Sequence, residues 1–451
     1  MNLQKSYDVI VVGGGVTGFV AATAASRNGA KTLLIERDGA LGGTMTNAMV
    51  GPMMTFHSVN EQLIKGLAQE VVDWLVAIQA SPGHIIDNTG YVKTVTPFDN
   101  EALKLVAQRM VLESGADILL NTWVQDVIME ENTLRGVVVF NKGGTEKLFG
   151  RVLIDASGDA DIAFRSGAPW VMGRDIDQCV QPVSLMFKVG PIHIQAIKDH
   201  ITNHADDFNM TPEGIQALKG QTHIAVNGFI KKLQQSIKSG ELPLHRDHVL
   251  FFSANDPNEA VINMSRIAVV DPLNTWEMTK AELLGREQMF VLMAFLQKYI
   301  PGFEKAHILA AGNRVGVRET RRIIGEYILT GEDVLNGKHF PDAVMRNAYP
   351  IDIHPPTVGE TNQDLFLKYG EYYEIPYRCL VPLKVEQLLV AGRCISATHE
   401  AQGSTRTSPA CMALGQAAGT AAALSVREET NPRNLQSEKL QQTLRDQGVY
   451  I

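Results

Sequence analysis

The first forty residues contain the feature that most constrains this fold, a glycine-rich turn between a strand and a helix. Residues 7–12 are apolar and rich in β-branched side chains, which predicts a buried parallel strand. Glycines in the spacing GxGxxG follow at Gly13, Gly15 and Gly18. Residues 19–28 are alanine-rich and helical, and 31–35 form a second apolar run. This order predicts a βαβ unit in a parallel, Rossmann-like sheet.

The glycine turn has the chemistry of a phosphate site. Gly13 permits the tight turn, Gly15 lets a pyrophosphate approach the backbone, and Gly18 lets the helix pack closely on the strand. The N-terminus of the helix offers free N–H groups and the positive end of the helix dipole. The residues predicted to bind the pyrophosphate are Gly13, Gly15, Val16, Thr17 and Gly18.

Glu36 stands at the end of the second strand, where the ribose of a dinucleotide is expected. Its carboxylate can accept hydrogen bonds from both ribose hydroxyls and would repel a 2′-phosphate, so NADP is disfavoured. A second glycine cluster follows at Gly42 and Gly43. With these residues the chain resembles the FAD-dependent oxidoreductases of the glutathione-reductase-like superfamily. The resemblance implies that the neighbouring Arg37 and Thr44 also contact FAD.

Two later segments are expected to return to the cofactor. In the resembling superfamily, a residue near Val124 meets the adenine through its backbone. Residues 151–164 form a strand and a small-residue turn that resemble the second fingerprint of that superfamily. The turn residues implied near the flavin are Ala156, Ser157 and Gly158. Asp159 and Asp161 have the composition of a metal pair, but no histidine lies nearby at ligand spacing, so they are interpreted as solvated or capping residues and no metal site is expected.

Residues 387–424 are interpreted as a strand, turn and helix that complete the cofactor domain. The strand at 388–391 ends at Gly392, and the helix begins near Ser408 and Pro409. We expect this unit to lie beside the first strand, with the helix N-terminus facing the N1–C2=O edge of the flavin, where negative charge collects on reduction. The expected cofactor contacts in this segment are Gly392, Arg393, Ser408 and Ala410.

A narrower resemblance rests on residues 315–334, 375–382 and 388–406. These segments resemble a subgroup of uncharacterised FAD-dependent oxidoreductases that are distantly similar to fumarate reductase and succinate dehydrogenase flavoproteins. Fumarate-reductase-like proteins carry an acid where this chain has Arg393, and an asparagine before the arginine that corresponds to Arg406. Arg406 is therefore a candidate anchor for a substrate or for the flavin, and a fumarate-like substrate does not follow.

The predicted fold class is α/β. A Rossmann-like FAD-binding domain with a parallel sheet is expected to be interleaved with a second, α+β domain that carries or caps the substrate site. The FAD-binding domain is assigned to residues 1–165 and 386–451, and the substrate domain to 166–385. Residues 186–190 predict a strand, and 279–300 predict a long amphipathic helix.

Residues 313–322 contain four arginines, with apolar residues alternating as in a strand. The expected faces are Arg314, Arg318 and Arg322 on one side and Val315, Val317, Glu319 and Arg321 on the other. Arg318 and Arg321 are candidates to bind an anionic substrate or to stabilise the charge of the reduced flavin. The structural alternative is an ion pair with Glu319, Glu326 or Asp333, and the other two arginines are assigned to structure or solvent.

The remaining candidates are general acids and bases. His399 lies seven residues after Gly392, on a loop expected to face the flavin, and would take a proton while hydride moves to flavin N5. His354 is expected to line the pocket, and Tyr377, in a strand pattern, is a candidate acid. His57 is a candidate flavin contact, or a covalent flavin attachment of the succinate-dehydrogenase kind, although its local sequence differs from that motif.

The composition narrows the range of partners. A formal net charge of −8 disfavours nucleic acid, so the arginine run calls for a local anion. Four cysteines without a CxxC pair fit a reducing compartment. We find no apolar stretch of about twenty residues and no cleavable signal sequence, so a cytoplasmic protein without a membrane span is expected. A homo-oligomer is left open.

The expected function is that of an FAD-dependent oxidoreductase. It would transfer a hydride between a small polar or anionic organic substrate and flavin N5, and exchange electrons with a donor or acceptor that the sequence does not identify. Three alternatives remain open at this point. They are a non-catalytic protein that keeps the FAD fold to bind a partner, a thiazole-synthase-like enzyme that holds NAD, and an RNA-modifying flavoprotein.

Overall fold

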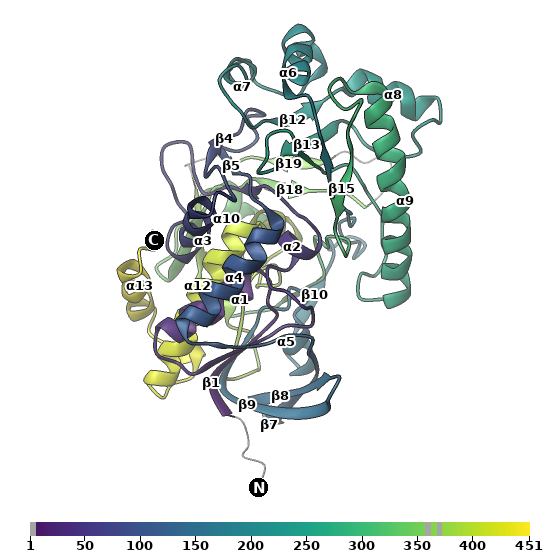
Figure 1. Cartoon of the computed structure of the whole chain (residues 1–451). Coiled ribbons are helices and arrows are strands. Elements are labelled where there is room, and N and C mark those ends of the chain that lie inside the picture. The colour runs from purple at the N-terminus through teal and green to yellow at the C-terminus, as the bar shows by residue number, and fades with distance from the viewer. Residues whose placement is uncertain (1–5, 357–361, 368–371) are drawn as a thin grey trace.

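The computed structural model describes residues 6–356, 362–367 and 372–451 of the chain. One half of the molecule is built on a seven-stranded sheet, drawn in the lower part of Figure 1. In spatial order its strands are β6 (Asp117–Leu119), β2 (Thr32–Ile35), β1 (Ser6–Val12), β9 (Gly144–Asp155), β8 (Thr133–Asn141) and β7 (Trp123–Glu130), and β21 (Leu388–Val390) also pairs with β9. The β6, β2, β1, β9 and β21 pairings are parallel, whereas β7, β8 and β9 form an antiparallel meander. The predicted α/β class with a parallel, Rossmann-like sheet is confirmed.

Two helices from opposite ends of the chain pack closely on one another. α1 (Val16–Arg27) and α12 (Ser408–Arg427) lie side by side near the centre of Figure 1. Glycines of α12 permit this approach, because a Cβ on Gly415 would lie 2.3 Å from the carbonyl oxygen of Thr17, and one on Gly419 would lie 2.2 Å from that of Ala21. The same half contains α3 (Leu67–Ala77), α4 (Asn100–Ser114) and α13 (Ser437–Asp446).

The sequence predicted that the C-terminal strand lies beside the first strand, and this prediction is wrong. β21 pairs with the last residues of β9, from Leu388 opposite Leu153 to Val390 opposite Asp155, while the neighbours of β1 are β2 and β9. The cause is the length of β9. Its first half pairs with the meander, and its second half is left to hold β1 on one edge and β21 on the other.

The other half of the molecule is a smaller antiparallel sheet flanked by helices, drawn at the top of Figure 1. Its strand order is β12 (Ala225–Gly228), β13 (Val249–Ser253), β14 (Ala260–Ile262), β11 (Phe187–Gly190) and β15 (His307–Ala311). The helices are α6 (Ile194–Asn203), α7 (Pro212–Ala217), α8 (Ile230–Lys238) and α9 (Thr275–Tyr299). The strand predicted at 186–190 and the long helix predicted at 279–300 are both confirmed, as β11 and α9.

Short elements connect the two halves. The small sheets pair β3 (Met53–Met54) and β4 (Ile85–Ile86) with β5 (Thr94–Thr96), β10 (Trp170–Met172) with β16 (Arg321–Ile323), β17 (Ala343–Asn347) with β20 (Tyr373–Pro376), and β18 (Ile351–Ile353) with β19 (Gln363–Leu365). The short helices are α2 (Thr44–Asn47), α5 (Asp161–Arg165), α10 (Gly331–Leu335) and α11 (His399–Thr405), and 3-10 turns span Ala205–Asp207, Tyr377–Leu380 and Pro432–Asn434.

The strand expected across residues 313–322 forms only at the C-terminal end of that segment, as β16. Only β16 is extended and paired, because the preceding backbone bonds to scattered partners: the Arg314 N–H donates to the carbonyl of Asn47, and the Gly316 N–H to that of Ser184. The predicted alternation of faces therefore does not apply to this segment. The strand pattern at Tyr377 is likewise replaced by a 3-10 turn.

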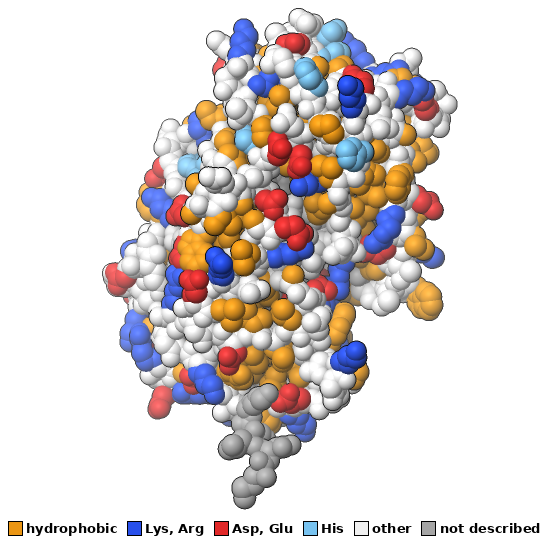
Figure 2. All heavy atoms as spheres, in the orientation of Figure 1, with side chains coloured by type: hydrophobic (Ala, Val, Ile, Leu, Met, Phe, Trp, Pro, Cys, Tyr) orange, Lys and Arg blue, Asp and Glu red, His pale blue; other side chains and the backbone are white. Residues whose placement is uncertain are grey.

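Two large hydrophobic cores define the halves. The second core draws its buried residues from 180–315, whereas buried residues at 329–381 join the core of the half that contains the seven-stranded sheet. We therefore propose 180–315 as the body of the second domain, narrower than the predicted 166–385. None of the helices in the described ranges combines the length and the apolar character needed to span a bilayer. On the face shown in Figure 2, acidic and basic side chains are interspersed.

Candidate FAD and substrate site

In the glycine turn after β1, Gly13 and Gly18 are tightly packed, whereas the space beside Gly15 is open. A Cβ on Gly18 would lie 1.7 Å from the carbonyl oxygen of Gly13, and Gly13 itself, at φ +99°, lies against the backbone of Ala156. At Gly15 a Cβ would meet only the Cα of Gly43, at 3.8 Å. No side chain caps α1, so its first N–H groups are left for a ligand. The open place is where a pyrophosphate fits.

The second glycine cluster lies directly against the first. The Gly42 N–H donates to the carbonyl of Gly14 at 2.9 Å, and Gly15 and Gly42 form an isolated parallel bridge. Gly43 has φ +55°, and a Cβ there would lie 2.7 Å from the Cα of Gly15. α2 starts at the next residue, Thr44. The two glycine clusters therefore line one backbone cradle.

Glu36 is buried at the end of β2. Its carboxylate accepts the Gly14 N–H at 2.5 Å and the Asp38 N–H at 2.8 Å. Burial raises the pKa of Glu36, and these two N–H donors oppose the shift. The Thr122 N–H donates to the carbonyl of Glu36, which places the start of β7, and with it Val124, beside the predicted ribose position. Arg37 lies over the ring of Trp123, 5.2 Å from its centre.

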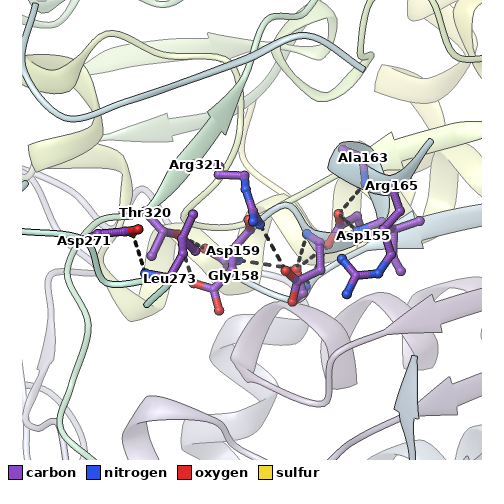
Figure 3. Close-up of polar contacts among 12 residues, drawn as sticks. Asp155, Gly158, Asp159, Ala163, Arg165, Asp271, Leu273, Thr320 and Arg321 are labelled. Carbon is purple, nitrogen blue, oxygen red and sulfur yellow. Dashed lines mark hydrogen bonds and ion pairs between the residues drawn. The ribbon is translucent and has the colours of Figure 1, made fainter. Parts of the chain in front are cut away.

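The turn after β9 is held by Asp155 (Figure 3). This fully buried carboxylate accepts the Ser157 hydroxyl at 2.6 Å and the N–H groups of Ile162 and Ala163 at 2.8 and 2.9 Å. The turn therefore presents Ala156 against Gly13, beside the phosphate cradle.

The other acids of this turn are paired with arginines. Asp159 accepts from Thr320 at 2.9 Å (Figure 3). It also accepts from Arg393 at 2.5 Å, and Asp161 accepts from Arg321 at 3.1 Å. Burial raises the pKa of Asp159, but Arg393 and then Arg37 outweigh it and lower the value. Asp159 and Asp161 thus form salt bridges with Arg393 and Arg321, respectively.

These contacts also place two predicted site residues. Arg321 donates to the carbonyl of Asp159 at 3.0 Å and lies over the ring of Phe164, 4.2 Å from its centre, so its guanidinium holds the β9 turn. Arg393 is held by Asp159. Gly392, before it, has φ +91°, and a Cβ there would lie 2.5 Å from the hydroxyl of Thr17.

The N-terminus of α12 is uncapped. Thr407 occupies the N-cap position, but its hydroxyl makes no capping bond and is buried without a partner among the described residues, as is the hydroxyl of Thr405. Pro409 has no N–H, so the free donors of this end include those of Ser408 and Ala410. An uncapped, buried helix start with orphaned hydroxyls calls for an acceptor from outside the chain, and the flavin carbonyl edge has that chemistry. The residues present therefore fit FAD.

A buried charge cluster surrounds Asp352, at the middle of β18. Its carboxylate accepts from Arg406 at 3.0 Å, pairs with His354 Nε2 at 3.1 Å and accepts the Tyr349 hydroxyl at 3.2 Å. Burial would raise the pKa of Asp352, but His354, Arg406 and then Arg318 outweigh it and hold the value well below its usual range. The sequence predicted Arg318, His354 and Arg406 separately, and the structure brings these three together.

Arg318 projects into the same cluster. Its Nη1 donates to the carbonyl of Pro182 at 2.6 Å and to the hydroxyl of Ser184 at 2.8 Å. Burial, followed by repulsion from Arg406, lowers the pKa of Arg318 to about 9. Within the described residues, the Nε of Arg406 is buried without a partner. The cluster therefore offers an unused guanidinium donor close to Asp352.

Sequence reasoning missed several members of this cluster. Arg246 and His248 lie just before β13, and Arg266 lies after β14. Burial and then Arg246 lower the pKa of His248 to about 4. Asp352 lay in a stretch that gave no motif. The local signal was weak, because each residue stands alone in its segment and acquires its electrostatic neighbours only in the folded chain.

His399 lies in a separate buried network. It is the first residue of α11, rather than a loop residue, and its Nδ1 lies 2.9 Å from Glu319. Glu319 also pairs with Arg322, as the structural alternative for the arginine run foresaw, and accepts the Gln181 N–H at 3.3 Å. Gln402 of α11 donates to the carbonyl of Arg318 at 2.7 Å. The network therefore holds the backbone of Arg318 in place.

Two candidates lie apart from these networks. The Tyr377 hydroxyl donates to the carbonyl of Pro432 at 2.9 Å and is buried in the core of the FAD-binding half, and burial strongly raises its pKa. His57 Nδ1 lies 3.0 Å from the Thr94 hydroxyl, and its ring packs edge-on against His84. Burial, with Lys93 and Lys65, lowers the pKa of His57. Tyr377 thus packs in the core, and the described contacts of His57 are with Thr94 and His84.

Known proteins resemble this chain over different lengths. A digeranylgeranylglycerophospholipid reductase of Methanoculleus marisnigri is 27% identical over 195 residues, which cover 40% of this chain and 46% of that protein. A thiamine thiazole synthase of Aeropyrum pernix is 35% identical over 132 residues, or 29% of this chain and 43% of that protein. The chain thus matches less than half the length of these relatives.

Solved structures and a family description complete the comparison. A geranylgeranyl bacteriochlorophyll reductase-like protein from Thermoplasma acidophilum aligns with a TM-score of 0.47 and 13% identity, covering 99% of this chain and 85% of that one. L-proline dehydrogenase from P. horikoshii aligns with a TM-score of 0.43 and 12% identity, covering 100% of both chains. The family described as FAD dependent oxidoreductase matches residues 8–444. Because that match spans nearly the whole sequence, and the glycine cradle, Glu36 and the uncapped helix α12 fit the cofactor, the chain belongs to the FAD dependent oxidoreductase family.

Proposed function

We propose that this oxidoreductase oxidises or reduces a small organic anion held by Arg318 and Arg406. The observation that carries the proposal is the cluster at Asp352, where the Nε of Arg406 is buried without a partner among the described residues, and where burial, followed by repulsion from Arg406, lowers the pKa of Arg318 to about 9. A bound carboxylate would supply the missing negative charge and accept a bidentate pair of hydrogen bonds. The bound FAD supplies hydride transfer at flavin N5.

His354 is proposed as the group that exchanges a proton with the substrate. A neutral imidazole that donates from Nε2 to Asp352 carries its lone pair on Nδ1, so that nitrogen is free to take a proton. Burial lowers the pKa of His354 to about 4, with Arg318 and Arg406 adding to the shift and Asp352 opposing it. The ring is therefore neutral near pH 7. His399, bound to the buried Glu319, is proposed as a positioning residue.

The proposed chemistry serves both directions, since oxidation and reduction share one transition state. In oxidation, Arg318 and Arg406 fix the carboxylate, and His354 takes the proton that leaves the substrate's hydroxyl or amine. In reduction, the same ring returns that proton. Asp352 keeps the His354 ring oriented and stabilises its charged form.

The experiment that tests the proposal is an anaerobic screen of flavin reduction. FAD-loaded protein is mixed with hydroxy and amino acids, and with the matching uncharged amides, while the visible absorbance of the flavin is followed. We expect bleaching by at least one acid and not by its amide. Equal bleaching by an acid and its amide would contradict an arginine-held anion.

Replacing Arg406 with Met is expected to raise the KM or Kd of the acid by about 100-fold, because the variant loses a buried charge-assisted pair. Arg406→Lys keeps the charge without the fork and should recover part of the loss. The matched control is Arg135→Met, which removes an exposed ion pair with Glu130 and should leave binding unchanged. Retained flavin absorbance in all three variants separates substrate binding from cofactor binding.

The pH dependence of kcat/KM provides a separate test of His354. The base form of His354 is lost only as the pH falls through about 4, so the acidic limb should lie well below the usual histidine range. The profile is measured by single-turnover flavin reduction with a substrate found in the screen. A His354→Asn variant should lower the rate and abolish that limb. An acidic limb that persists unchanged in His354→Asn would contradict the assignment of the proton to His354.

A further inference from the structure

One face of α9 carries large apolar side chains that the described part of the chain leaves exposed. Trp276 is 80% exposed, Leu283 is 61% exposed and Phe290 is 66% exposed. Single exposed apolar side chains are ordinary on a protein surface, but a row of them along one helix is typical of an interaction site. α9 runs along the right-hand edge of the molecule in Figure 1.

The spacing of these side chains places them on one line along the helix, because they are seven residues apart. At about 100° per residue, the positions that fall within an arc of about 80° are Trp276, Lys280, Leu283, Glu287 and Phe290. The buried residues of α9 lie on the opposite side of the helix and are Ala281, Gly285, Met289, Leu292, Met293, Phe295 and Leu296. The helix therefore has two apolar faces, and the core of the second half covers only one of them.

Two opposite charges interrupt the exposed row. Lys280 and Glu287 are exposed and stand on either side of Leu283. Neither side chain forms a hydrogen bond or an ion pair with another described residue. Glu277, one turn before Lys280, already accepts two backbone N–H groups of the preceding turn, at 2.8 and 3.0 Å. The face thus offers one cation and one anion to a partner, on opposite sides of its central leucine.

We propose that this face binds the same face of a second copy of the chain, with the two α9 helices antiparallel about a two-fold axis near Leu283. That axis places Trp276 of one protomer opposite Phe290 of its partner. It also places Lys280 of each protomer beside Glu287 of its partner, so the contact is complementary to itself in shape and in charge. A parallel arrangement would place lysine against lysine and glutamate against glutamate, which repulsion between like charges disfavours.

The contact is small, so the expected dimer is reversible. One pair of helices with three apolar layers buries less area than a standard interface, and we expect a Kd on the order of 1–10 µM. The measurement is sedimentation velocity of the FAD-loaded protein at concentrations from about 0.5 to about 100 µM, a range chosen to bracket that Kd. A species with the mass of one chain across the whole range would overturn the proposal.

Leu283→Asp tests whether the exposed face of α9 carries the contact. The substitution brings two like charges together at the two-fold axis and should raise the Kd of the dimer at least about 50-fold. Leu112→Asp on α4 is the matched control, because Leu112 is 50% exposed and lies on another helix, and it should leave the Kd unchanged. A dimer as tight in Leu283→Asp as in the unaltered protein would place the contact elsewhere and overturn the proposal.

Exchanging the charges tests the antiparallel direction. Lys280→Glu and Glu287→Lys should each form a homodimer about 10-fold more weakly than the unaltered protein, because each homodimer pairs like charges. A mixture of the two variants should form a mixed dimer at about the native affinity, because every glutamate then meets a lysine of the other variant. One variant carries a fluorescent label, so that its sedimentation reports the mixed dimer. If the mixed pair associates no more tightly than either variant alone, the antiparallel pairing is wrong.

The flavin provides an internal check on every variant. None of the substituted residues belongs to the glycine cradle or to the cluster at Asp352. Each variant should therefore retain the flavin absorbance and the circular dichroism of the unaltered protein, and a change in sedimentation then reports assembly and not unfolding.

Discussion

Replacing Glu319 with Ala is expected to lower the free energy of unfolding by about 3–5 kcal/mol, the usual result of breaking a buried ion pair by removing one partner. Glu319 is 0% exposed and Arg322 is 1% exposed. The variant would leave the Arg322 guanidinium buried without its counter-ion and the Nδ1 of His399 without its partner. The measurement is urea unfolding of the FAD-loaded protein, followed by circular dichroism and flavin fluorescence.

Two comparisons make this expectation specific. Glu130→Ala, the matched control, removes an exposed ion pair with Arg135 and should change the free energy of unfolding by no more than about 1 kcal/mol. Glu319→Gln keeps hydrogen-bond acceptance but removes the charge, and should fall between the two. A loss in Glu319→Ala no larger than that of the control would show that Arg322 is satisfied by its bonds to the carbonyls of Ala397 and Gly173 alone.

The same network links stability to the proposed site. Glu319 accepts the backbone N–H of Gln181, and the side-chain carbonyl of Gln181 accepts the backbone N–H of His354 at 3.2 Å. The side chain of Gln402 donates to the backbone carbonyl of Arg318. Loosening Glu319 is therefore expected to weaken substrate binding as well as folding. This differs from the control variant, because Glu130 lies on the meander of the FAD-binding half.

The parts of this molecule that the sequence predicts are those set by local chemistry. The order strand, GxGxxG, helix and acid has few structural solutions, and β1, α1, β2 and Glu36 follow it. The serine and proline at 408–409 likewise predicted the start of α12. Each of these features depends on backbone conformation and steric fit within one segment.

The parts that sequence reasoning missed depend on contacts between distant segments. The arginine run has the alternation of a strand, but a strand also needs a partner edge, and before Arg321 the backbone bonds to scattered segments instead. The position of β21 depended on the length of β9, which the local pattern did not fix. Arg406 and Asp352 lie 54 residues apart and carry no shared motif, and only the fold brings them to hydrogen-bonding distance.

Replacing Gly15 with Ala is expected to weaken FAD binding by about 100-fold while leaving the stability of the FAD-free protein within about 0.5 kcal/mol. In this structure a Cβ at Gly15 meets only the Cα of Gly43, at 3.8 Å, and Gly15 has φ −64°, so the FAD-free chain can accept the methyl group. The same methyl group would occupy the open side of the cradle, where the N–H groups of α1 meet a pyrophosphate.

Gly18→Ala provides the contrasting result, because its Cβ would lie 1.7 Å from the carbonyl oxygen of Gly13 and force α1 away from β1. This variant should lose both stability and FAD, whereas Gly220→Ala, with no atom within 4 Å of its Cβ, should lose neither. FAD affinity is measured by quenching of flavin fluorescence on titration into FAD-free protein, and stability by urea unfolding. If Gly15→Ala binds FAD as tightly as the unaltered protein, the pyrophosphate does not occupy the cradle between Gly15 and Gly43, and the cofactor contacts assigned to both glycine clusters are wrong.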